Sequence, residues 1–588
     1  MVQLQNLVPN PNTMDTWVPR PGSVLLTEFP GFTTPGFVSA LFVIGDIAYG
    51  MIASGLHAGK DQPFAYNIST NTFETVSGIT AANTPTSPAT SGDWVPPIMD
   101  VVGSKVVVTH PGFAGGALGF FFGWFDISGF TDASKTGDTH LSTTIDNLSA
   151  NVLQAGWTPG MTITGAGIPA GTTIVSIAVG GLSLVTSAAS TIAAAGVALT
   201  VAGGTAVAPL WAAGNTNGNP LLKVPVSVKQ LSGRAYFAVG SSLVLSDVGD
   251  ATQVTNATQV LTPNNGLAIT AIGQLPLSSP ITGGIIQALV AFQGVAAMQV
   301  ITGDPTTTDL RINIMKVGTG TLAPLSIVSH NDGMAFISPE GMRVVNFSAV
   351  VSNPIGDGGT GITTPFIYAI SPSRIAATAN ADVIRISVQD GSDFGQPHEE
   401  YWFDLTRKCF HGAHSFPADQ IQPWRATFIL APVGVTGKLF QSDAQPNTSS
   451  VYTENGSAIT WVFQTSLLPD ADGQGNMNCI IESNLAANFP PQTQTTVNAL
   501  DENETVLDSV IMSGTGAPAT TWGSFVWGAA PWLGGAGFFR QRPIQWHVPI
   551  VFKQGFIQIT GPSLSGLVLG NLYIRYQELG YNIEMGPS

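Results

Sequence analysis

Charged side chains are scarce in this chain, and basic ones are the scarcest. Only 10% of the 588 residues are Asp, Glu, Lys or Arg, and 20 Lys and Arg stand against 36 Asp and Glu, which gives a formal net charge of −16. A protein that binds nucleic acid through its phosphates needs clustered Lys and Arg. The composition therefore argues against a general nucleic-acid-binding surface.

Cysteine is nearly absent as well. Cys409 and Cys479 are too few for a disulfide framework and lack the close pairing of a zinc site, so we interpret them as buried free thiols. The first residues show neither a basic nor an apolar signal region, which predicts synthesis and assembly in a cytoplasm. Apolar runs at 37–52 and 192–213 are interrupted by Asp, Gly or Pro, so we predict no membrane span.

The chain is rich in turn residues and in short apolar runs. It contains 67 Gly and 40 Pro, and 44% of its residues are hydrophobic. A unit of alternating apolar strand, Gly-centred or Asn-centred turn and second strand recurs along it. Such repetition, with almost no helical periodicity, predicts radially arranged β-sheets. Clear examples lie at 103–113 with 121–128, at 233–247, at 287–304 and at 332–348.

These units predict an all-β fold. We expect a β-propeller-like core of about six or seven blades, an inserted small β domain and a C-terminal β-rich domain. Arms such as the first segment often pack on a neighbouring subunit, and pairing of this arm with a C-terminal strand is the expected closure of the ring. The predicted segments are an extended N-terminal arm (1–35), a first propeller part (36–130), the inserted domain (131–206), a second propeller part (207–455) and a C-terminal closure or interface domain (456–588).

The inserted segment stands out by its lack of charge. No Asp, Glu, Lys, Arg or His lies between Asn147 and Leu222. Its Thr, Val and Ile residues with Gly turns predict a small all-β module. An uncharged surface favours packing on other subunits or contacts made through hydroxyl groups, and a plain spacer module is the alternative.

Motifs for phosphate binding are incomplete. Residues 54–61 resemble a phosphate-binding loop, but Ser54 stands where its first Gly belongs and Asp61 where its hydroxyl residue belongs. The glycine-rich segment 355–363 could surround an anion with its amides, yet it opens no helix, which favours a surface turn.

Two clusters of titratable residues are candidates for metal binding and catalysis. The first consists of His398, Glu399, Glu400, His411 and His414, and the second of Asp501, Glu502 and Glu504. Neighbouring residues of a strand point to opposite faces, which argues against the first cluster as a chelate. A charged cluster in a loop is usually a solvated turn, which is our interpretation of the second. We therefore predict no catalytic residue, no metal, no cofactor and no enzymatic activity.

An aromatic-rich stretch at 520–546 is the strongest candidate for an interface. Large rings and arginines separated by glycines are typical of the residues that dominate protein interfaces. A core of large rings at the closure of a sheet is the alternative. The candidate interface residues are Trp522, Trp527, Trp532, Phe538, Phe539, Arg540, Arg542 and Trp546.

The order of the repeated units resembles the tail nozzle, or tail tubular, proteins of short-tailed bacteriophages. The resemblance covers most of 36–455 and rests on VVVTHPGF with FFGWFDIS, VKQLSGRAYFAVGSSLVLSD, ITGGIIQALVAFQG with QVITGD, GMAFISPEGMRVV and EEYWFDLTRKCFHGAHSF. GMTITGAGIPAGTTIVSI is similar to small β modules found in many phage virion proteins. The resemblance implies a structural virion protein, six copies of which surround a DNA ejection channel beneath the portal and adaptor, with fibres or spikes docked outside.

The acidic composition suits such a channel, because a wall that attracts phosphate weakly lets DNA slide, and we expect Asp and Glu on the lumen. One alternative is a receptor-binding tailspike or polysaccharide depolymerase, which would show a trimeric β-helix with short periodic rungs rather than irregular spacing. Another is a soluble propeller enzyme or lectin outside any virus, which fits the fold but leaves the uncharged insert unexplained.

Overall fold

The computed structural model describes residues between 3 and 581, and nearly all of their regular secondary structure is β-strand. Two short 3₁₀ helices, η2 (Pro324–Ser326) and η3 (Pro372–Arg374), interrupt them. None of the described helical segments has the length and apolarity needed to cross a membrane. The ranges that are not described are 1–2, 11–15, 30–35, 54–58, 75, 88–94, 114–119, 128–133, 150–151, 153–156, 158, 179–181, 203–208, 217–220, 222, 256–258, 264, 279–284, 304–309, 356–365, 367–368, 370, 381, 390–397, 417, 434–436, 444–451, 455, 469–475, 491–492, 515–539, 565 and 582–588.

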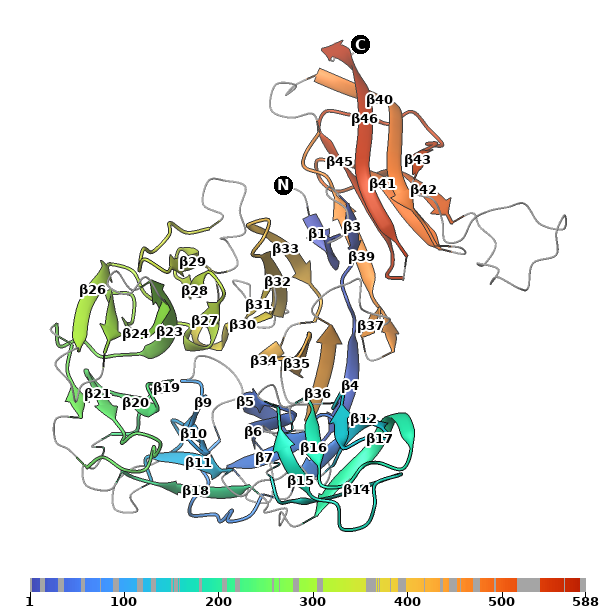
Figure 1. Cartoon of the computed structure of the whole chain (residues 1–588). Helices are drawn as coiled ribbons and strands as arrows, with labels where there is room; N and C mark the ends of the chain where they lie inside the picture. Colours follow the sequence, from blue (N-terminus) through green and yellow to red (C-terminus); the bar gives the residue numbers. More distant parts are fainter. Residues whose placement is uncertain are drawn as a thin grey trace.

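Seven antiparallel sheets are arranged as the blades of a ring (Figure 1). From the axis outward, blade 1 consists of β5 (Phe37–Ile44), β6 (Ile47–Ala53), β7 (Asp61–Asn67) and β8 (Thr72–Glu74), and blade 2 of β9 (Ile98–Val102), β10 (Lys105–Thr109), β11 (Phe122–Asp126) and β18 (Leu210–Gly214). Blade 3 consists of β19 (Ser227–Leu231), β20 (Arg234–Val239), β21 (Ser242–Leu245) and β22 (Val260–Leu261), and blade 4 of β23 (Ala271–Ser278), β24 (Ile285–Gln293), β25 (Ala297–Thr302) and β26 (Arg311–Val317). Blade 5 consists of β27 (Val328–His330), β28 (Gly333–Ser338) and β29 (Gly341–Asn346). Blade 6 contains β30 (Ala376–Asn380), β31 (Val383–Gln389), β32 (His398–Asp404) and β33 (Cys409–His414). Blade 7 contains β34 (Ala418–Trp424), β35 (Thr427–Pro432) and β36 (Lys438–Asp443).

The innermost strands close the ring. They contact one another in the order β5, β9, β19, β23, β27, β30 and β34, and β34 contacts β5 again. The core lies between successive blades: Phe122 of blade 2 packs on Phe237 of blade 3 with ring centroids 4.8 Å apart. Phe292 of blade 4 packs on Phe336 of blade 5 at 5.1 Å. The predicted propeller-like fold is confirmed, and the ring has seven blades.

Local sequence signals explain the strands of each blade. All residues of β6 and most of β20 are buried, because a middle strand of a blade packs against a neighbouring blade on each of its faces. Tight turns join the strands, and Gly45 and Gly240 take positive φ angles of 58° and 61° in two of them. A residue with a side chain would be strained at these positions.

The N-terminal segment ties the molecule together. It forms β1 (Gln3–Gln5), β2 (Leu7–Pro9), β3 (Trp17–Pro19) and β4 (Ser23–Glu28). Strand β4 pairs with β36 and becomes the fourth strand of blade 7, while β1 lies between β33 of blade 6 and β39 of the C-terminal domain. The described part of the expected arm thus pairs within its own chain, where it covers strand edges that would otherwise expose unpaired backbone groups.

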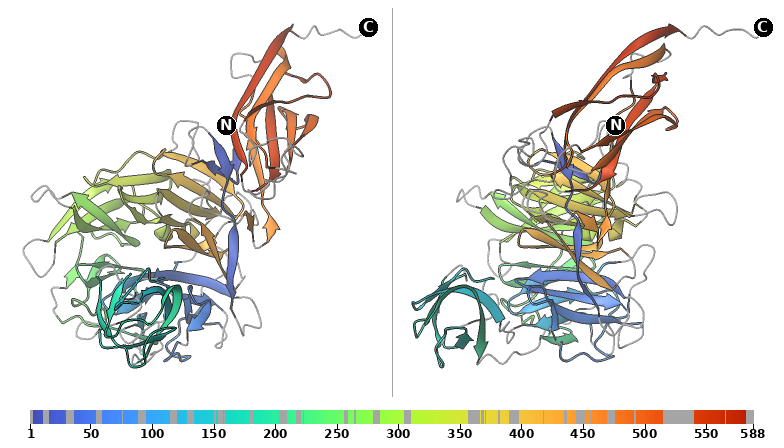
Figure 2. Two further views of the ribbon diagram at one scale, coloured as in Figure 1. Left: turned by 45° about the vertical axis from the view of Figure 1, so that its right-hand side comes forward. Right: turned by 90° about the vertical axis from the view of Figure 1, so that its right-hand side faces the viewer.

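The inserted module interrupts blade 2 between β11 and β18. It is a six-stranded antiparallel sheet with its own core, which includes Ile145, Trp157 and Leu199. In the edge-on view of the ring, the module lies off one face (Figure 2, right). Its strands are β12 (Ser134–His140), β13 (Thr144–Asp146), β14 (Thr162–Gly165), β15 (Ile174–Ile177), β16 (Leu184–Thr186) and β17 (Ala193–Ala202).

The C-terminal domain is a two-layered β-sandwich beyond the rim of the ring (Figure 2). Trp461, Val497 and Ile559 of one layer pack against Leu485 and Leu569 of the other. The first layer continues the sheet of blade 6 through β1, and the second includes β2 and β3. The first layer consists of β39 (Thr460–Gln464), β45 (Gly555–Pro562), β41 (Gln494–Asp501) and β42 (Val506–Ser513). The second layer contains β46 (Val568–Tyr581), β40 (Asn476–Asn488), β43 (Arg540–Pro543) and β44 (Val551–Phe552).

The two cysteines differ from expectation in their burial. Both are free, and both are half-buried rather than buried. Cys409 lies at the start of β33, where burial raises the pKa of its thiol, with Asp404 adding to the effect.

Candidate functional site

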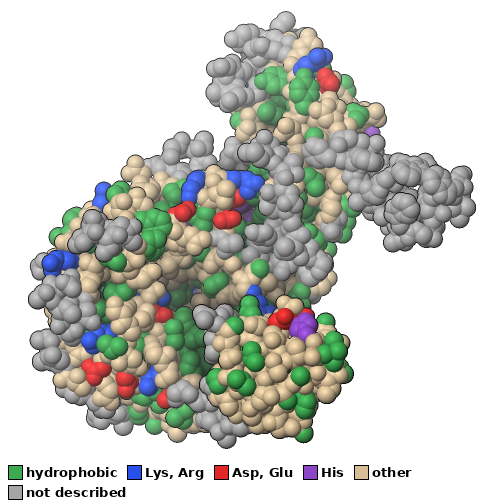
Figure 3. Space-filling model, in the orientation of Figure 1, with side chains coloured by type: hydrophobic (Ala, Val, Ile, Leu, Met, Phe, Trp, Pro, Cys, Tyr) green, Lys and Arg blue, Asp and Glu red, His purple; other side chains and the backbone are tan. Residues whose placement is uncertain are grey.

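The ring encloses a cavity on its axis. The cavity has a volume of about 360 Å³ and is lined by the innermost strands of all seven blades. Amide and hydroxyl side chains such as Gln274, Gln420 and Gln422 dominate its polar lining, and Asp100 and Lys229 are the two charged residues among the described ones that line it. Asp100 is held in place because its carboxylate accepts a hydrogen bond from the Gln230 backbone N–H at 2.7 Å. The face of the ring drawn in Figure 3 is hollowed at the centre.

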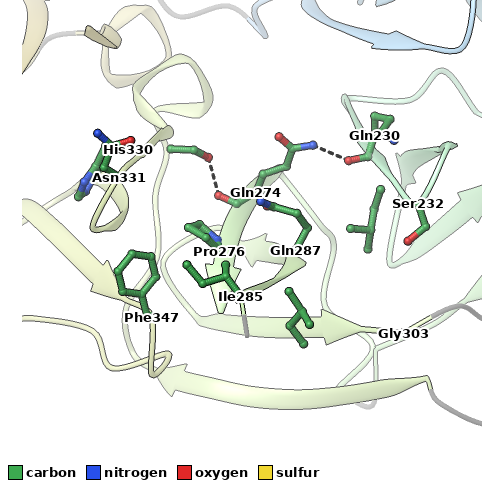
Figure 4. A pocket seen from close by; sticks show the side chains of 13 residues that line it. Gln230, Ser232, Gln274, Pro276, Ile285, Gln287, Gly303, His330, Asn331 and Phe347 are labelled. Carbon is green, nitrogen blue, oxygen red and sulfur yellow. Dashed lines mark hydrogen bonds between the residues drawn. The ribbon is translucent and has the colours of Figure 1, made fainter. Parts of the chain in front are cut away.

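A larger pocket opens on one face of the ring beside this cavity. Its volume is about 990 Å³, and it lies at the turns of blades 3, 4 and 5 (Figure 4). Gln274 and Ser329 line both the pocket and the axial cavity. The residues that line the pocket are Gln230, Leu231, Ser232, Gln274, Pro276, Ile285, Ile286, Gln287, Gly303, Ser329, His330, Asn331 and Phe347.

Hydrogen bonds between blades hold the pocket wall. The Gln274 side-chain amide donates to the Gln230 carbonyl, and the Ser329 hydroxyl donates to the Gln274 carbonyl at 2.6 Å (Figure 4). These two bonds connect β19, β23 and β27, the innermost strands of three successive blades. The wall is therefore fixed by polar contacts as well as by the packing of the blades.

His330 contributes a neutral imidazole to the pocket. Burial lowers its pKa, with a smaller opposing effect of Asp332, so the ring is uncharged at neutral pH. Its Nδ1 accepts a hydrogen bond from the Asp332 backbone N–H at 3.2 Å, which leaves the proton on Nε2. Nε2 is buried and has no hydrogen-bond partner within the described part of the chain.

Most of the predicted interface residues lie outside the described residues. Trp522, Trp527, Trp532, Phe538 and Phe539 belong to 515–539, which the structure does not describe.

The three remaining candidates lie in or next to β43. Arg540 begins the strand. Arg542 lies over the Phe489 ring at 5.1 Å and donates to the Ser513 carbonyl at 3.0 Å, and Trp546 donates to the Ser483 hydroxyl at 2.9 Å. Arg542 and Trp546 thus contribute to the sandwich itself, and the interface stays a prediction.

The first titratable cluster is used in packing. Glu400 forms a fully buried bidentate pair with Arg385, whose guanidinium lies 4.8 Å from the Trp402 ring. His414 accepts a hydrogen bond from the Asn6 backbone N–H at 3.1 Å, and Glu399 accepts one from the Tyr401 hydroxyl at 2.5 Å. His411 packs edge-on against Trp17. No three His, Cys, Asp or Glu side chains converge on a common point within the described ranges.

The other sequence candidates are turns or lie outside the described residues. Asp501 accepts hydrogen bonds from the backbone N–H groups of Asn503 and Thr505, at 2.9 and 2.8 Å, in the hairpin turn between β41 and β42. Residues 54–58 and 356–365, which include most of both phosphate-loop candidates, are not described.

A buried cluster that sequence inspection missed joins blades 1 and 2. One carboxylate oxygen of Asp61 accepts hydrogen bonds from the Ser39 hydroxyl and, at 2.9 Å, from His110 Nε2. These are the residue types of a hydrolytic triad, but serine and histidine bind the same carboxylate instead of each other, and all three are buried. No spacing signal links positions 39, 61 and 110, so only the fold reveals this contact, and its role is to join the blades.

Comparison with known proteins finds solved structures that match this chain at low identity and low TM-score. The sequence matches no family model and no curated protein. Among solved structures, a mutant of Trypanosoma rangeli sialidase with trans-sialidase activity is 8% identical, covers 97% of this chain and 95% of its own, and gives a TM-score of 0.26. A glycoside hydrolase family 43 arabinoxylan arabinofuranohydrolase from Bacillus subtilis is 9% identical, covers 60% of this chain and 95% of its own, and gives a TM-score of 0.22.

These matches contradict one expectation from the sequence. We expected no enzymatic activity, but the similar solved structures are glycoside hydrolases and sialidases, so the exclusion of catalysis was wrong. The absence of a catalytic motif does not exclude catalysis, because residues that are far apart in the sequence can meet in a propeller. At these identities and TM-scores the matches assign no activity and no catalytic residue to this chain.

Proposed function

We propose that this chain is a structural subunit of the tail of a short-tailed bacteriophage, of the nozzle (tail tubular) kind. Several copies, six by the family resemblance, would surround the path of the ejected DNA and bind adaptor and fibre proteins. The proposal begins from the resemblance of the ordered strand units over 36–455. The arrangement of two further β modules around one propeller supports it.

The surface of the C-terminal sandwich is the main support for assembly. Four large apolar side chains are exposed on the paired strands β40 and β46: Ile481 (47% exposed), Tyr573 (48%), Tyr576 (39%) and Leu579 (54%). Exposed apolar groups along one pair of strands favour contact with another protein, and tyrosine is enriched at such contacts. The sandwich extends beyond the rim, where it can reach a neighbouring copy (Figure 2).

The ring axis of one subunit does not suit the passage of DNA. Its cavity of about 360 Å³ has the size of a small-ligand site. In the proposed assembly DNA therefore passes between subunits, along a wall formed by several propellers. A chain with net charge −16 suits that wall, because few Lys and Arg are available to retain the phosphates.

The number of copies tests the proposal. Native mass spectrometry of the purified chain and cryo-electron microscopy of virions should show a sixfold ring on the tail axis. Three copies would favour the tailspike alternative, and a location off the axis would contradict a nozzle. A lumen lined by Lys and Arg would contradict the argument from weak attraction.

Surface variants sharpen this test. Tyr573→Asp with Tyr576→Asp should convert the ring to monomers, because the new charges would have to be buried in an apolar contact. Val248→Asp, at an exposed position of blade 3 (61% exposed), is the matched control and should leave the assembly intact. An intact ring in the double variant would exclude β46 from the subunit contact.

A further inference from the structure

We propose that the pocket at the turns of blades 3, 4 and 5 is a binding site for a neutral oligosaccharide. The inference rests on the lining of this pocket alone and does not depend on the assembly of the chain into a tail.

The absence of charge narrows the ligand class. None of the described residues that line the pocket is Asp, Glu, Lys or Arg. Phosphate and carboxylate ligands are usually held by Arg or Lys, and hard cations by carboxylates. A pocket with neither kind of group favours an uncharged ligand.

The hydrogen-bonding groups of the pocket suit hydroxyl groups. The side chains of Ser232, Gln287 and Asn331 are exposed in the pocket, and none has a side-chain partner within the described residues. Amides and hydroxyls both donate and accept hydrogen bonds. Sugar hydroxyls also donate and accept, so one oligosaccharide can satisfy all these groups.

The apolar part of the lining suits the carbon faces of sugar rings. Pro276, Ile285 and Phe347 lie on the same side of the pocket, below Gln274 in Figure 4. Phe347 is half-buried and Ile285 is 64% exposed, so both present apolar surface to a ligand. The volume of about 990 Å³ lies at the upper end of the usual range for ligand sites, which allows several sugar units.

The inserted module lies on the same face of the ring as the pocket. Its Lys135 contacts Asp46 in the β5–β6 turn, while the pocket includes Ser232 of the β19–β20 turn and Asn331 of the β27–β28 turn. First turns of successive blades lie on one face of a propeller, because the innermost strands run in the same direction. A long saccharide in the pocket can therefore extend toward the module.

Binding of neutral oligosaccharides to the whole chain tests the proposal. Isothermal titration and saturation-transfer NMR with maltotriose, cellotriose and isomaltotriose, together with an array of neutral glycans, should identify at least one ligand. The double variant Gln287→Ala with Asn331→Ala should weaken its binding about tenfold, since two or more hydrogen bonds are lost. Asn313 is an exposed amide on β26 of blade 4, the blade of Gln287. The control variant Asn313→Ala should bind the oligosaccharide as tightly as the unmodified chain does.

Three results would overturn the proposal. One is the absence of binding by every neutral glycan at about 10 mM, which corresponds to an affinity too weak for a built site. Another is equal affinity in the double variant and in the Asn313→Ala control. The third is that the pocket binds only sialic acid, inorganic phosphate or short peptides. Thermal melts of all variants should agree, because the changed side chains are exposed and make no contacts that support the fold.

Discussion

The two modules around the propeller are attached by different means. The C-terminal sandwich shares its sheets with the rest of the molecule, because β1 joins it to blade 6. Within the described ranges, the inserted module shares no sheet with the ring. Among the described contacts, it meets the ring through Lys135, whose ammonium lies 3.5 Å from Asp46, and Asp46 also binds Arg425 at 2.9 Å.

This difference predicts different degrees of independence. Continuous backbone pairing makes the sandwich and the propeller one cooperative structure, whereas a contact through side chains lets a module with its own core keep its fold when the contact is lost. The sandwich would then transmit force between ring and rim, and the insert would behave as a separate unit on one face. The following experiments test this contrast.

The largest effect is expected at Arg20, which is completely buried. It donates to Asn6 at 2.8 Å and to the Ser415 hydroxyl at 3.2 Å, and it pairs with Glu454. Arg20→Met leaves the Glu454 carboxylate without its charge partner, and should lower the free energy of unfolding by about 3–5 kcal/mol.

Urea unfolding measures this loss. Arg311→Met, at an exposed arginine of β26, is the control and should change stability by less than about 0.5 kcal/mol. Similar values for both variants would mean that the N-terminal segment does not hold the sandwich to the ring.

Acid should weaken the same junction. Burial lowers the pKa of His411 to about 4, against a smaller opposing effect of Asp404, and Arg407 adds to the lowering. Burial also lowers the pKa of His414, which lies close to Arg20 and Arg385. Because the unfolded chain binds these protons first, stability falls as the pH drops from about 6.5 toward 4, by roughly 3 kcal/mol for His411.

Hydrogen exchange across this pH range locates the effect. Exchange should accelerate in β1, β2 and β33, and much less in β12 and β17 of the insert. His411→Phe keeps a ring against Trp17 and should reduce the response, whereas His140→Asn, at a half-exposed position of the insert, should not. An equal response of both modules would contradict the contrast between them.

The smallest effect is expected at Lys135. Its side chain and that of Asp46 are almost fully buried, but Asp46 keeps Arg425 and the Trp424 indole N–H at 3.2 Å when the lysine is removed. These two partners bind Oδ1, and Oδ2 loses the lysine, so Lys135→Met should cost about 1–2 kcal/mol. Limited proteolysis should then cut more readily around the module, while exchange in its own core stays slow. Unfolding of the module itself would show that the ring supports its fold.

The sequence predicted the blades well because their signals are local. Alternating apolar residues and turn glycines such as Gly45 and Gly240 lie within a few residues of the strands that they define. The uncharged composition marked the small β insert in the same way.

Contacts between distant segments could not be predicted. Nothing near Leu25 indicates that it pairs with Phe440, and nothing near Lys135 indicates Asp46. The pocket could not be predicted for the same reason, since Ser232, Gln287 and Asn331 come from turns and strands of three blades and form no motif. The aromatic stretch was the strongest local signal for an interface, and most of it lies outside the described residues.

Strand β4 has a consequence for the order in which the molecule folds. It precedes blade 1 in the sequence, yet its partner strand, β36, lies in blade 7 and ends at Asp443. Blade 7 cannot be completed until β36 has been synthesised, and until then the edges of the growing blades are open to wrong pairing. Folding should therefore be slow and limited by this long-range step, and dependence on chaperones during synthesis is the cost of a ring whose last blade takes a strand from before its first blade.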